Sequence, residues 1–383
     1  MASHVSFLRN MASYVSYLVV LILIMSPAGH NAHRIPPRPC AFNAIYQLGD
    51  SISDTGNLVR ESPLGAYLPF NRLPYGESML HHHPTGRCSN GLLMIDFLAK
   101  ALRLPLLNPY LNKEANFQHG VNFAVAGSTA LNASFLAENK IYSPVTNSSL
   151  PVQLDWFSNH LKSVCFSKFE CDLVLKKALF MVGEVGGNDY NYAFFQQKSM
   201  DELKALVPHV VESIRNASER VIDLGARHLV VPGNFPIGCL PIYLTAFKTN
   251  DSAAYDDKKC LKGLNEFAMF HNNELQSMLA QLRREHPNVV ILYADYYNAL
   301  QWVFSHASSL GFEEESVMKA CCGTGGDYNF DVTKMCATEG VGACPNPDLR
   351  EEFEAPSKGF KDRKGIKCEE PNRQKTLTIK KLT

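Results

Sequence analysis

Short apolar segments that alternate with longer amphipathic segments constrain the fold of this chain most strongly. Four segments have the composition of buried strands, at residues 44–48, 178–182, 228–232 and 289–293. Three others repeat their apolar residues with a helical period, at residues 92–99, 201–224 and 265–284. Strands separated by helices of this length predict βαβ units, and therefore a parallel sheet covered by helices on both faces.

Ligands of such sheets bind at the carboxyl ends of the strands. Two glycine-rich turns follow predicted strands directly, at residues 49–51 and 183–189. The chain has no long linker, and its only internal repeat is a near-duplication within the first 16 residues. We therefore expect one α/β domain with a site at this edge of the sheet.

The N-terminus has the pattern of a secretion signal. Arg9 precedes an apolar run at residues 17–25, and small or turn-forming residues follow at 26–29. This pattern predicts a cleaved signal peptide over residues 1–29, with a membrane anchor as the alternative. The run is too short to span a bilayer comfortably. Export would take the protein to the extracellular space (the apoplast) or to the vacuole.

Cysteines and glycosylation sequons agree with export. The chain has 11 cysteines, an odd number that leaves at least one free or paired with another chain. Cys165 and Cys171 are close enough in sequence to close a small loop, as are Cys336 and Cys344. Four Asn-X-Ser sequons predict glycosylation, at Asn132, Asn147, Asn216 and Asn250.

The charge balance and the metal-ligating residues argue against several other classes of partner. The chain has 37 basic and 37 acidic residues, which gives no electrostatic case for nucleic acid or an anionic membrane surface. No Cys/His array has the spacing of a zinc site. We expect no metal and no cofactor. The sequence does not indicate an oligomeric state.

The turn after the first predicted strand is a candidate nucleophile site. Gly49-Asp50-Ser51 opens the run at residues 49–57. A serine hydroxyl needs a tight turn that exposes it and a base that takes its proton. By itself the tripeptide is equally compatible with an ordinary loop turn.

Two segments further along the chain could stabilise a developing oxyanion. Residues 120–128 contain Gly127, and residues 186–189 contain Asn188; these offer a backbone N–H and a side-chain amide. Together with residues 49–57, these segments closely resemble the plant GDSL members of the SGNH hydrolase family. Five further segments match that family, at residues 74–77, 84–91, 236–241, 293–299 and 321–326. The resemblance covers residues 41–348, and among plant members it is greatest to the acetylajmalan esterase and sinapine esterase branch.

The resemblance implies a fold, an activity and residue roles. The fold is a three-layer αβα sandwich around a flavodoxin-like parallel sheet. The activity is a secreted carboxylester hydrolase, acting on acetyl or other small acyl esters of a plant specialised metabolite. Ser51 would be the nucleophile, Gly127 and Asn188 would supply oxyanion donors beside the N–H of Ser51, and Asp54 and Asn57 would order the nucleophile loop.

The C-terminal part of the family pattern is not found. Family members end with a segment of the type Trp-Asp-X-X-His, which supplies the general base and its orienting aspartate. Here the match stops at Asp348, and no histidine follows His306. Residues 349–383 are highly charged, and we expect a poorly ordered tail. Either a frameshift or an alternative 3′ exon replaced the segment, or the protein lacks its general base.

Six histidines, three of them consecutive, could be considered as a substitute base: residues 81–83, His119, His271 and His306. Their expected roles are a solvated loop for the first group and structural or surface positions for the others. The alternative function is therefore a catalytically impaired glycoprotein that binds or stores a ligand on an esterase scaffold. Acyl transfer to an alcohol is a third hypothesis, since it uses the same acyl-enzyme.

Overall fold

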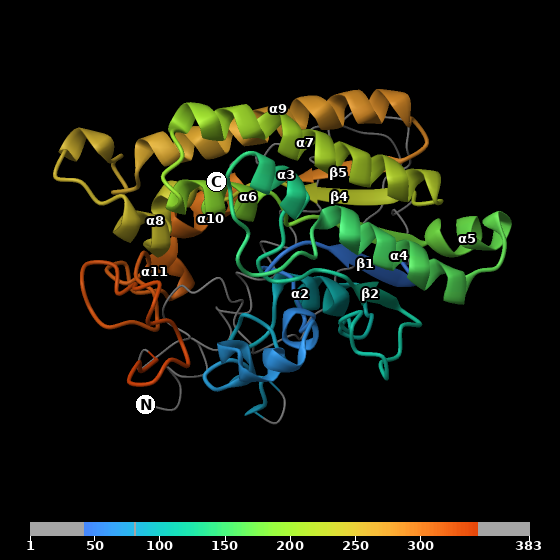
Figure 1. Cartoon of the computed structure of the whole chain (residues 1–383), viewed down its shortest axis with the longest axis horizontal. Coiled ribbons are helices and arrows are strands. Elements are labelled where there is room, and N and C mark those ends of the chain that lie inside the picture. Colours follow the sequence, from blue (N-terminus) through green and yellow to red (C-terminus); the bar gives the residue numbers. More distant parts are fainter. Residues whose placement is uncertain (1–41, 80–81, 344–383) are drawn as a thin grey trace, which may run out of the picture.

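A sheet of five parallel strands forms the centre of the protein (Figure 1). The computed structural model describes residues 42–79 and 82–343. The strands are β1 (Ala44–Leu48), β2 (Gly120–Asn122), β3 (Ala178–Val182), β4 (His228–Pro232) and β5 (Val290–Ala294). Their spatial order is β2-β1-β3-β4-β5. This is the flavodoxin-like order, in which the connection reverses direction between β2 and β3.

The strands are apolar on both faces, which explains why they form the middle layer. Alternate residues of a strand point to opposite faces. Tyr46 and Phe180 belong to one buried cluster, whereas Ile45 and Leu179 belong to a second cluster on the other face. Continuous apolar runs of this kind are typical of parallel sheets covered on both sides.

Helices cover both faces, so the fold is a three-layer αβα sandwich. The larger cluster is closed by side chains from α4 (Leu150–Val164), α6 (Gly187–Phe195), α7 (Met200–Asp223) and α9 (Lys262–Glu285). The smaller cluster is closed by α2 (Met94–Ala101) and α10 (Tyr296–Ser305). Figure 1 shows α7 and α9 on one side of the sheet and α2 on the other. Shorter helices complete the chain: α3 (Ala133–Glu138), α5 (Lys168–Leu175), α8 (Pro241–Ala246) and α11 (Ala307–Leu310).

The predicted alternation of strands and helices is confirmed. The predicted strands at residues 44–48, 178–182 and 228–232 coincide with β1, β3 and β4, and β5 is displaced by one residue. The helix expected from residue 201 begins at Met200, because the Ser199 hydroxyl accepts the N–H of Glu202 in a capping box.

Three disulfides join described cysteines: Cys165–Cys171, Cys239–Cys260 and Cys322–Cys336. The first pairing is as predicted. The prediction that Cys336 pairs with Cys344 is wrong, because Cys336 bonds to Cys322 instead. Closeness in sequence does not decide a pairing, since the Cα separation and side-chain directions must also fit.

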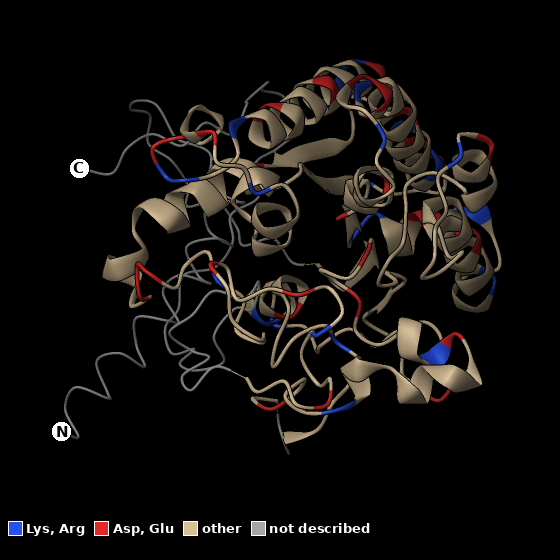
Figure 2. Ribbon diagram, turned by 60° about the vertical axis from the view of Figure 1, so that its left-hand side comes forward, with Lys and Arg blue, Asp and Glu red and all other residues tan. Residues whose placement is uncertain are grey.

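Acidic and basic residues are mixed along the longer helices α4, α7 and α9, whereas α8, α10 and α11 carry no charged residue (Figure 2). None of the helices in the described ranges has the length and hydropathy to cross a membrane. The predicted signal segment at residues 1–29 and the predicted tail at residues 349–383 lie outside the described residues.

Candidate active site

The three predicted site residues follow three neighbouring strands. Ser51 comes after β1, Gly127 after β2 and Asn188 after β3. These strands are adjacent and parallel in the order β2-β1-β3, so their carboxyl ends lie at one edge of the sheet. All three residues are half-buried, which keeps them accessible at that edge. The sheet topology therefore brings together segments that are up to 137 residues apart in sequence, as the numbers 51 and 188 show.

The turn after β1 is held by its own backbone and by Asp50. The carbonyl oxygen of Asp50 accepts the N–H groups of Ser53 at 3.2 Å and Asp54 at 3.0 Å. The Asp50 carboxylate accepts the N–H of Ile52 at 3.0 Å. These bonds leave Ser51 at the tip of a tight turn, while residues 53–59 are buried. This is the exposed turn that a serine nucleophile requires.

Asp54 is the main hydrogen-bond acceptor of the nucleophile loop. Its buried carboxylate accepts the N–H groups of Gly56 (2.7 Å), Asn57 (2.6 Å) and Leu58 (3.1 Å). It also accepts the N–H of Ala126 at 2.8 Å, which ties this loop to the segment that carries Gly127. Burial raises the pKa of Asp54, although the four N–H bonds act in the opposite direction.

Asn57 connects the same loop to β2. Its amide nitrogen donates to the carbonyl oxygens of Asn122 (2.9 Å) and Ala124 (2.8 Å), and its amide oxygen accepts the N–H of Leu111. Asn57 is fully buried, and every polar atom of its amide has a partner. The side chains of Asp54 and Asn57 thus join the nucleophile loop to its neighbour.

Gln153 on α4 is a supporting residue that the sequence analysis missed. Its amide oxygen accepts the N–H of Gly49 at 2.8 Å, and its amide nitrogen donates to the Gly49 carbonyl at 2.8 Å. The same nitrogen reaches the Ser128 hydroxyl at 2.8 Å. Gln153 lies 104 residues from Gly49. No local signal in the sequence points to it, since a glutamine in the first turn of a helix is usually a solvated residue.

Helix α6 holds the Gly127 segment through residues one turn apart. The Asn188 amide donates to the carbonyl oxygen of Ser128 at 2.9 Å, and the Tyr192 hydroxyl donates to the carbonyl oxygen of Gly127 at 2.7 Å. Residues four apart on a helix lie on the same face, so both bonds point to the same loop. Gly127 has a φ of +85°, a conformation that favours glycine.

Asp189 adds a third connection between α6 and that loop. Its two oxygens accept the N–H groups of Ala130 at 2.8 Å and Leu131 at 2.9 Å. The side chain is completely buried, and burial raises the pKa of this carboxyl to about 7 against the partial compensation of its N–H bonds. The position of Asn188 relative to Gly127 is therefore fixed by bonds from three residues of α6.

Backbone donors are available next to the candidate nucleophile. Within residues 42–79 and 82–343, no protein acceptor takes the backbone N–H of Ser51 or Gly127. The amide nitrogen of Asn188 donates one hydrogen to the Ser128 carbonyl, and its other contact is the Asp50 carboxylate at 3.5 Å, at the limit of a hydrogen bond. Donors that are only weakly engaged by the protein can turn to a developing oxyanion.

Carboxyl groups are buried below the turn. Burial raises the pKa of Asp50 well above its usual range, and the charges of Glu184, Asp189 and Asp54 add to the rise. Glu184 accepts a hydrogen bond from the Tyr296 hydroxyl at 2.6 Å, and burial raises its pKa as well. Both shifts favour the neutral form of these carboxyl groups, and a neutral carboxyl beside Asn188 would oppose a developing oxyanion less than a carboxylate would.

Three of the histidines considered as substitute bases have their contacts away from Ser51. The Nδ1 atom of His119 bonds to the carbonyl of Asn43, at the opposite edge of the sheet from Ser51. His271 is buried, with Nδ1 at 2.8 Å from the Tyr190 hydroxyl, and His306 stacks on Trp302 at the end of α10. None of these three hydrogen-bonds to Ser51, and the segment after Asp348 lies outside the described residues.

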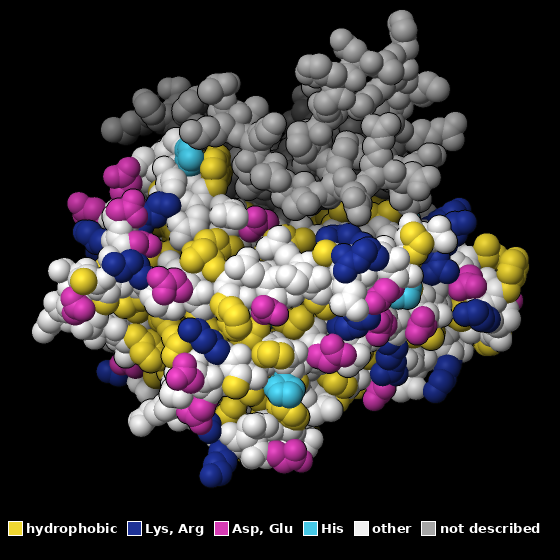
Figure 3. All heavy atoms as spheres, turned by 90° about the horizontal axis from the view of Figure 1, so that it is seen from above, with side chains coloured by type: hydrophobic (Ala, Val, Ile, Leu, Met, Phe, Trp, Pro, Cys, Tyr) yellow, Lys and Arg dark blue, Asp and Glu magenta, His cyan; other side chains and the backbone are white. Residues whose placement is uncertain are grey.

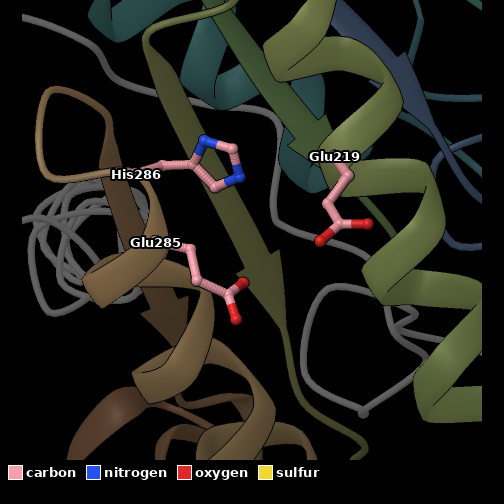
Figure 4. Close-up of side chains that lie close together, drawn as sticks. All are labelled: Glu219, Glu285 and His286. Atoms are coloured by element: carbon pink, nitrogen blue, oxygen red, sulfur yellow. The ribbon is translucent and has the colours of Figure 1, made fainter.

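One group of side chains has the composition of a metal site. Ligand atoms of Glu219, Glu285 and His286 lie within 4.8 Å of one another, and Figure 4 shows them projecting from two adjacent helical segments. Arg215 already bridges the two carboxylates, at 2.7 Å from Glu219 and 2.6 Å from Glu285. A cation would have to displace this guanidinium. We therefore interpret the group as a surface ion-pair network rather than a metal site.

Known proteins with similar sequences identify the family. The model of the GDSL-like lipase/acylhydrolase family matches residues 45–356. Acetylajmalan esterase 1 of Rauvolfia serpentina is 48% identical over 80% of this chain and 80% of its own length. A GDSL esterase/lipase of Arabidopsis thaliana is 45% identical over 86% of each chain.

A solved structure, that of phospholipase A1 from Streptomyces albidoflavus, shares 14% identity and a TM-score of 0.33, covering 76% of this chain and 92% of its own. This last similarity is too remote to carry an argument. The family model and the plant relatives cover most of the chain. The chain belongs to the GDSL-like lipase/acylhydrolase family of serine ester hydrolases.

Proposed function

We propose that Ser51 is the nucleophile of a carboxylester hydrolase, with the N–H groups of Ser51 and Gly127 and the Asn188 amide as its oxyanion donors. The observation that carries this proposal is the set of bonds from α6 to the Gly127 segment. They hold two candidate donors from different strands in a fixed relation beside the turn of Ser51. An arrangement of donors that is set before the substrate arrives is what stabilises an oxyanion most effectively.

The chemistry follows the usual course of acyl transfer. The Ser51 Oγ atom attacks the ester carbonyl carbon as its proton passes to a general base, which later returns it to the leaving alcohol, and the carbonyl oxygen becomes an oxyanion held by the three donors. In family members this base is the histidine of the Trp-Asp-X-X-His segment. The C–O bond to the alcohol then breaks, the alcohol leaves with a proton, and an acyl-enzyme remains. Water attacks the acyl-enzyme and releases the carboxylic acid, which restores the Ser51 hydroxyl.

For the substrate we propose an acetyl or other small acyl ester of a plant specialised metabolite. The support is the identity of 46–48% to the acetylajmalan esterases of Rauvolfia serpentina.

We propose further that the protein is exported, with a signal peptide at residues 1–29, a hydrolase domain at residues 41–348 and an atypical tail at residues 349–383. Disulfides among the described cysteines suit an oxidising compartment. All four sequon asparagines are exposed, at Asn132, Asn147, Asn216 and Asn250. An exposed side chain is a requirement for glycosylation at each of them.

The second candidate function is a glycoprotein that binds or stores a ligand without turnover. It is favoured by one sequence observation, the lack of a histidine after His306. Loss of a general base costs a serine hydrolase about 10⁴- to 10⁶-fold in rate. The oxyanion donors and substrate binding would leave about 10³- to 10⁴-fold over the uncatalysed reaction.

Turnover of p-nitrophenyl acetate by the purified chain separates the two functions. The proposal expects hydrolysis that Ser51→Ala abolishes and that Asn188→Ala reduces about 100-fold or more. Hydrolysis equal to that of Ser51→Ala would favour the binding protein. Genomic DNA across the codon for Asp348 then decides the origin of the tail: another reading frame that encodes Trp-Asp-X-X-His would assign the tail to a frameshift or exon change.

A further inference from the structure

Helix α5 (Lys168–Leu175) carries apolar side chains on two opposite faces. Cys171, Val174 and Leu175 pack against the main core. Phe169 and Leu173 are one turn apart on the opposite side, where they are 72% and 55% exposed. A surface helix of a globular protein normally places polar residues on its outer face. The outer apolar face of α5 therefore lacks a partner within the described part of the chain.

Phe166 extends this apolar face beyond the start of the helix. It precedes Ser167, the N-cap of α5, at the position that usually packs against the fourth residue of the helix. That fourth residue is Cys171, which is bonded to Cys165 instead. Phe166 is left 87% exposed, and the Glu170 carboxylate fixes its backbone by accepting its N–H at 2.8 Å. A disulfide-closed loop thus presents this ring to solvent.

Together with Val164, these side chains form what we call the α5 patch: Val164, Phe166, Phe169 and Leu173. Figure 1 shows α5 at one end of the molecule, beyond the edge of the sheet, and Figure 3 shows hydrophobic side chains at that end with basic and acidic side chains beside them. A ring that is 87% exposed projects from the surface rather than lining a groove.

The segment that carries the α5 patch has an excess of basic residues. Residues 162–177 contain four lysines and two acidic residues, a net charge of +2 in a chain whose total is zero. The lysines are exposed, at Lys162, Lys168, Lys176 and Lys177. The net charge of the whole chain is zero, which argued against an anionic surface as a partner, and it does not show this local excess of lysines. Basic side chains beside exposed aromatic rings are the pattern of peripheral membrane binding.

We propose that the α5 patch docks this protein onto the surface of an anionic lipid bilayer. Phe166, Phe169 and Leu173 enter the boundary between headgroups and acyl chains, and the lysines meet the phosphate groups. A projecting ring suits a fluid interface that closes around it, whereas a protein partner would need a pocket of matching shape. Charge complementarity with the lysines selects an anionic rather than a zwitterionic surface.

The docked orientation leaves the candidate active site facing away from the bilayer. Helix α4 begins beside Gly49, where Gln153 contacts the nucleophile turn, and ends at Val164 in the α5 patch. A helix of 15 residues is about 22 Å long, so the patch and the site lie at opposite ends of α4. Docking therefore places the enzyme at a membrane without presenting membrane lipids to Ser51.

Co-sedimentation with vesicles tests the proposal without any enzyme assay. We expect the full chain to bind vesicles of phosphatidylcholine with phosphatidylserine, and to bind pure phosphatidylcholine much less. Phe166→Ser with Phe169→Ser should weaken binding about tenfold or more, and Lys162→Glu with Lys168→Glu should remove the preference for phosphatidylserine. Phe166→Trp with Phe169→Trp should keep the binding of the wild type, because an aromatic ring remains at each position. Thermal unfolding confirms that each variant is folded.

Leu64→Ser with Tyr67→Ser is the matched control, because these side chains are also exposed, at 73% and 71%, but lie outside α5. Binding should be unchanged in this control. The proposal is overturned if the wild-type chain stays in the supernatant, or if the control loses binding as the patch variant does. It is also overturned if the chain forms a dimer in solution that the phenylalanine variant abolishes, since a second copy would then cover the patch.

Discussion

The Tyr192 hydroxyl donates a hydrogen bond to the carbonyl oxygen of Gly127, with 2.7 Å between the two oxygens. The peptide group on the other side of Gly127 carries the N–H that we assign to the oxyanion site. The helix that carries Asn188, the proposed side-chain donor, thus also restrains Gly127, the proposed backbone donor. The positions of the two proposed donors are therefore linked through α6.

Tyr192→Phe removes this bond and leaves the ring in place. We expect the hydrolysis rate of p-nitrophenyl acetate to fall about three- to tenfold, because one hydrogen bond contributes about 0.5–1.5 kcal/mol. Tyr142→Phe is the control, since this exposed residue is held to Gln196 by its backbone alone. Equal rates for wild type and Tyr192→Phe would show that the bond does not order the donor.

Gly127→Ala tests the backbone conformation directly. The φ of +85° is unfavourable for alanine, and the added methyl group would meet Val145 at 2.5 Å. We expect a loss of stability of about 1–3 kcal/mol together with a large loss of activity. Gly263→Ala in α9 has open space around it and should raise the free energy of unfolding by about 0.5–1 kcal/mol. Urea unfolding of both variants gives the comparison; a stable, active Gly127→Ala would contradict this account.

Asp54→Asn should destabilise the nucleophile loop. The buried carboxylate accepts four backbone N–H groups, and an asparagine amide would turn a donor toward some of them. The expected cost is about 2–4 kcal/mol in the free energy of unfolding. Asp251→Asn, at an exposed cap that accepts one N–H, should cost less than about 1 kcal/mol. Similar losses in the free energy of unfolding for the two variants would contradict the structural role assigned to Asp54.

Asp189 makes a distinct contribution to the pH dependence of stability. The folded protein keeps the Asp189 proton up to a pKa of about 7, whereas the unfolded chain releases it near 3.8. The folded state therefore binds more protons between these values, and the stability that Asp189 contributes falls as pH rises from about 4 to about 7. Below this window the contribution is complete, and above it no further change follows.

Urea unfolding of wild type and Asp189→Asn at several pH values measures this contribution. The advantage of the wild type should shrink by up to about 1.4 kcal/mol per pH unit across the window. Burial lowers the pKa of His160 and His271 to about 4 from 6.5. Their contribution to the free energy of unfolding therefore decreases as pH falls through this range, opposite to the pH trend of Asp189. Both histidines are present in both proteins, so they cancel in the difference. A difference that grows with pH would refute the assignment.

The sequence predicted the strands that carry long apolar runs, because continuous burial leaves a local signal. It did not predict β2, which has three residues and begins with Gly120. A side chain at Gly120 would meet the carbonyl oxygen of Ile45 at 1.8 Å, so this strand exists only through its close pairing with β1. Such pairing is a tertiary property that local periodicity does not contain.

The sequence placed two of the three candidate segments, those of Ser51 and Asn188, after predicted strands, whereas Gly127 follows the unpredicted β2. The parallel topology then brings all three segments to one edge of the sheet. Gln153 and Tyr192 act on these segments from helices, and their hydrogen bonds to Gly49 and Gly127 join residues 104 and 65 positions apart. The spacing of residues along the chain does not reveal such partners.

Covalent labelling of Ser51 tests the central claim most directly. The folded chain is treated with a fluorophosphonate, and the modified peptide is identified by mass spectrometry, beside Ser51→Ala and a version that carries a family-type Trp-Asp-X-X-His segment after Asp348. The account predicts one adduct, on Ser51, formed faster when that segment is present and lost in Ser51→Ala. A folded protein with the family-type segment that gains no adduct on Ser51 would contradict it.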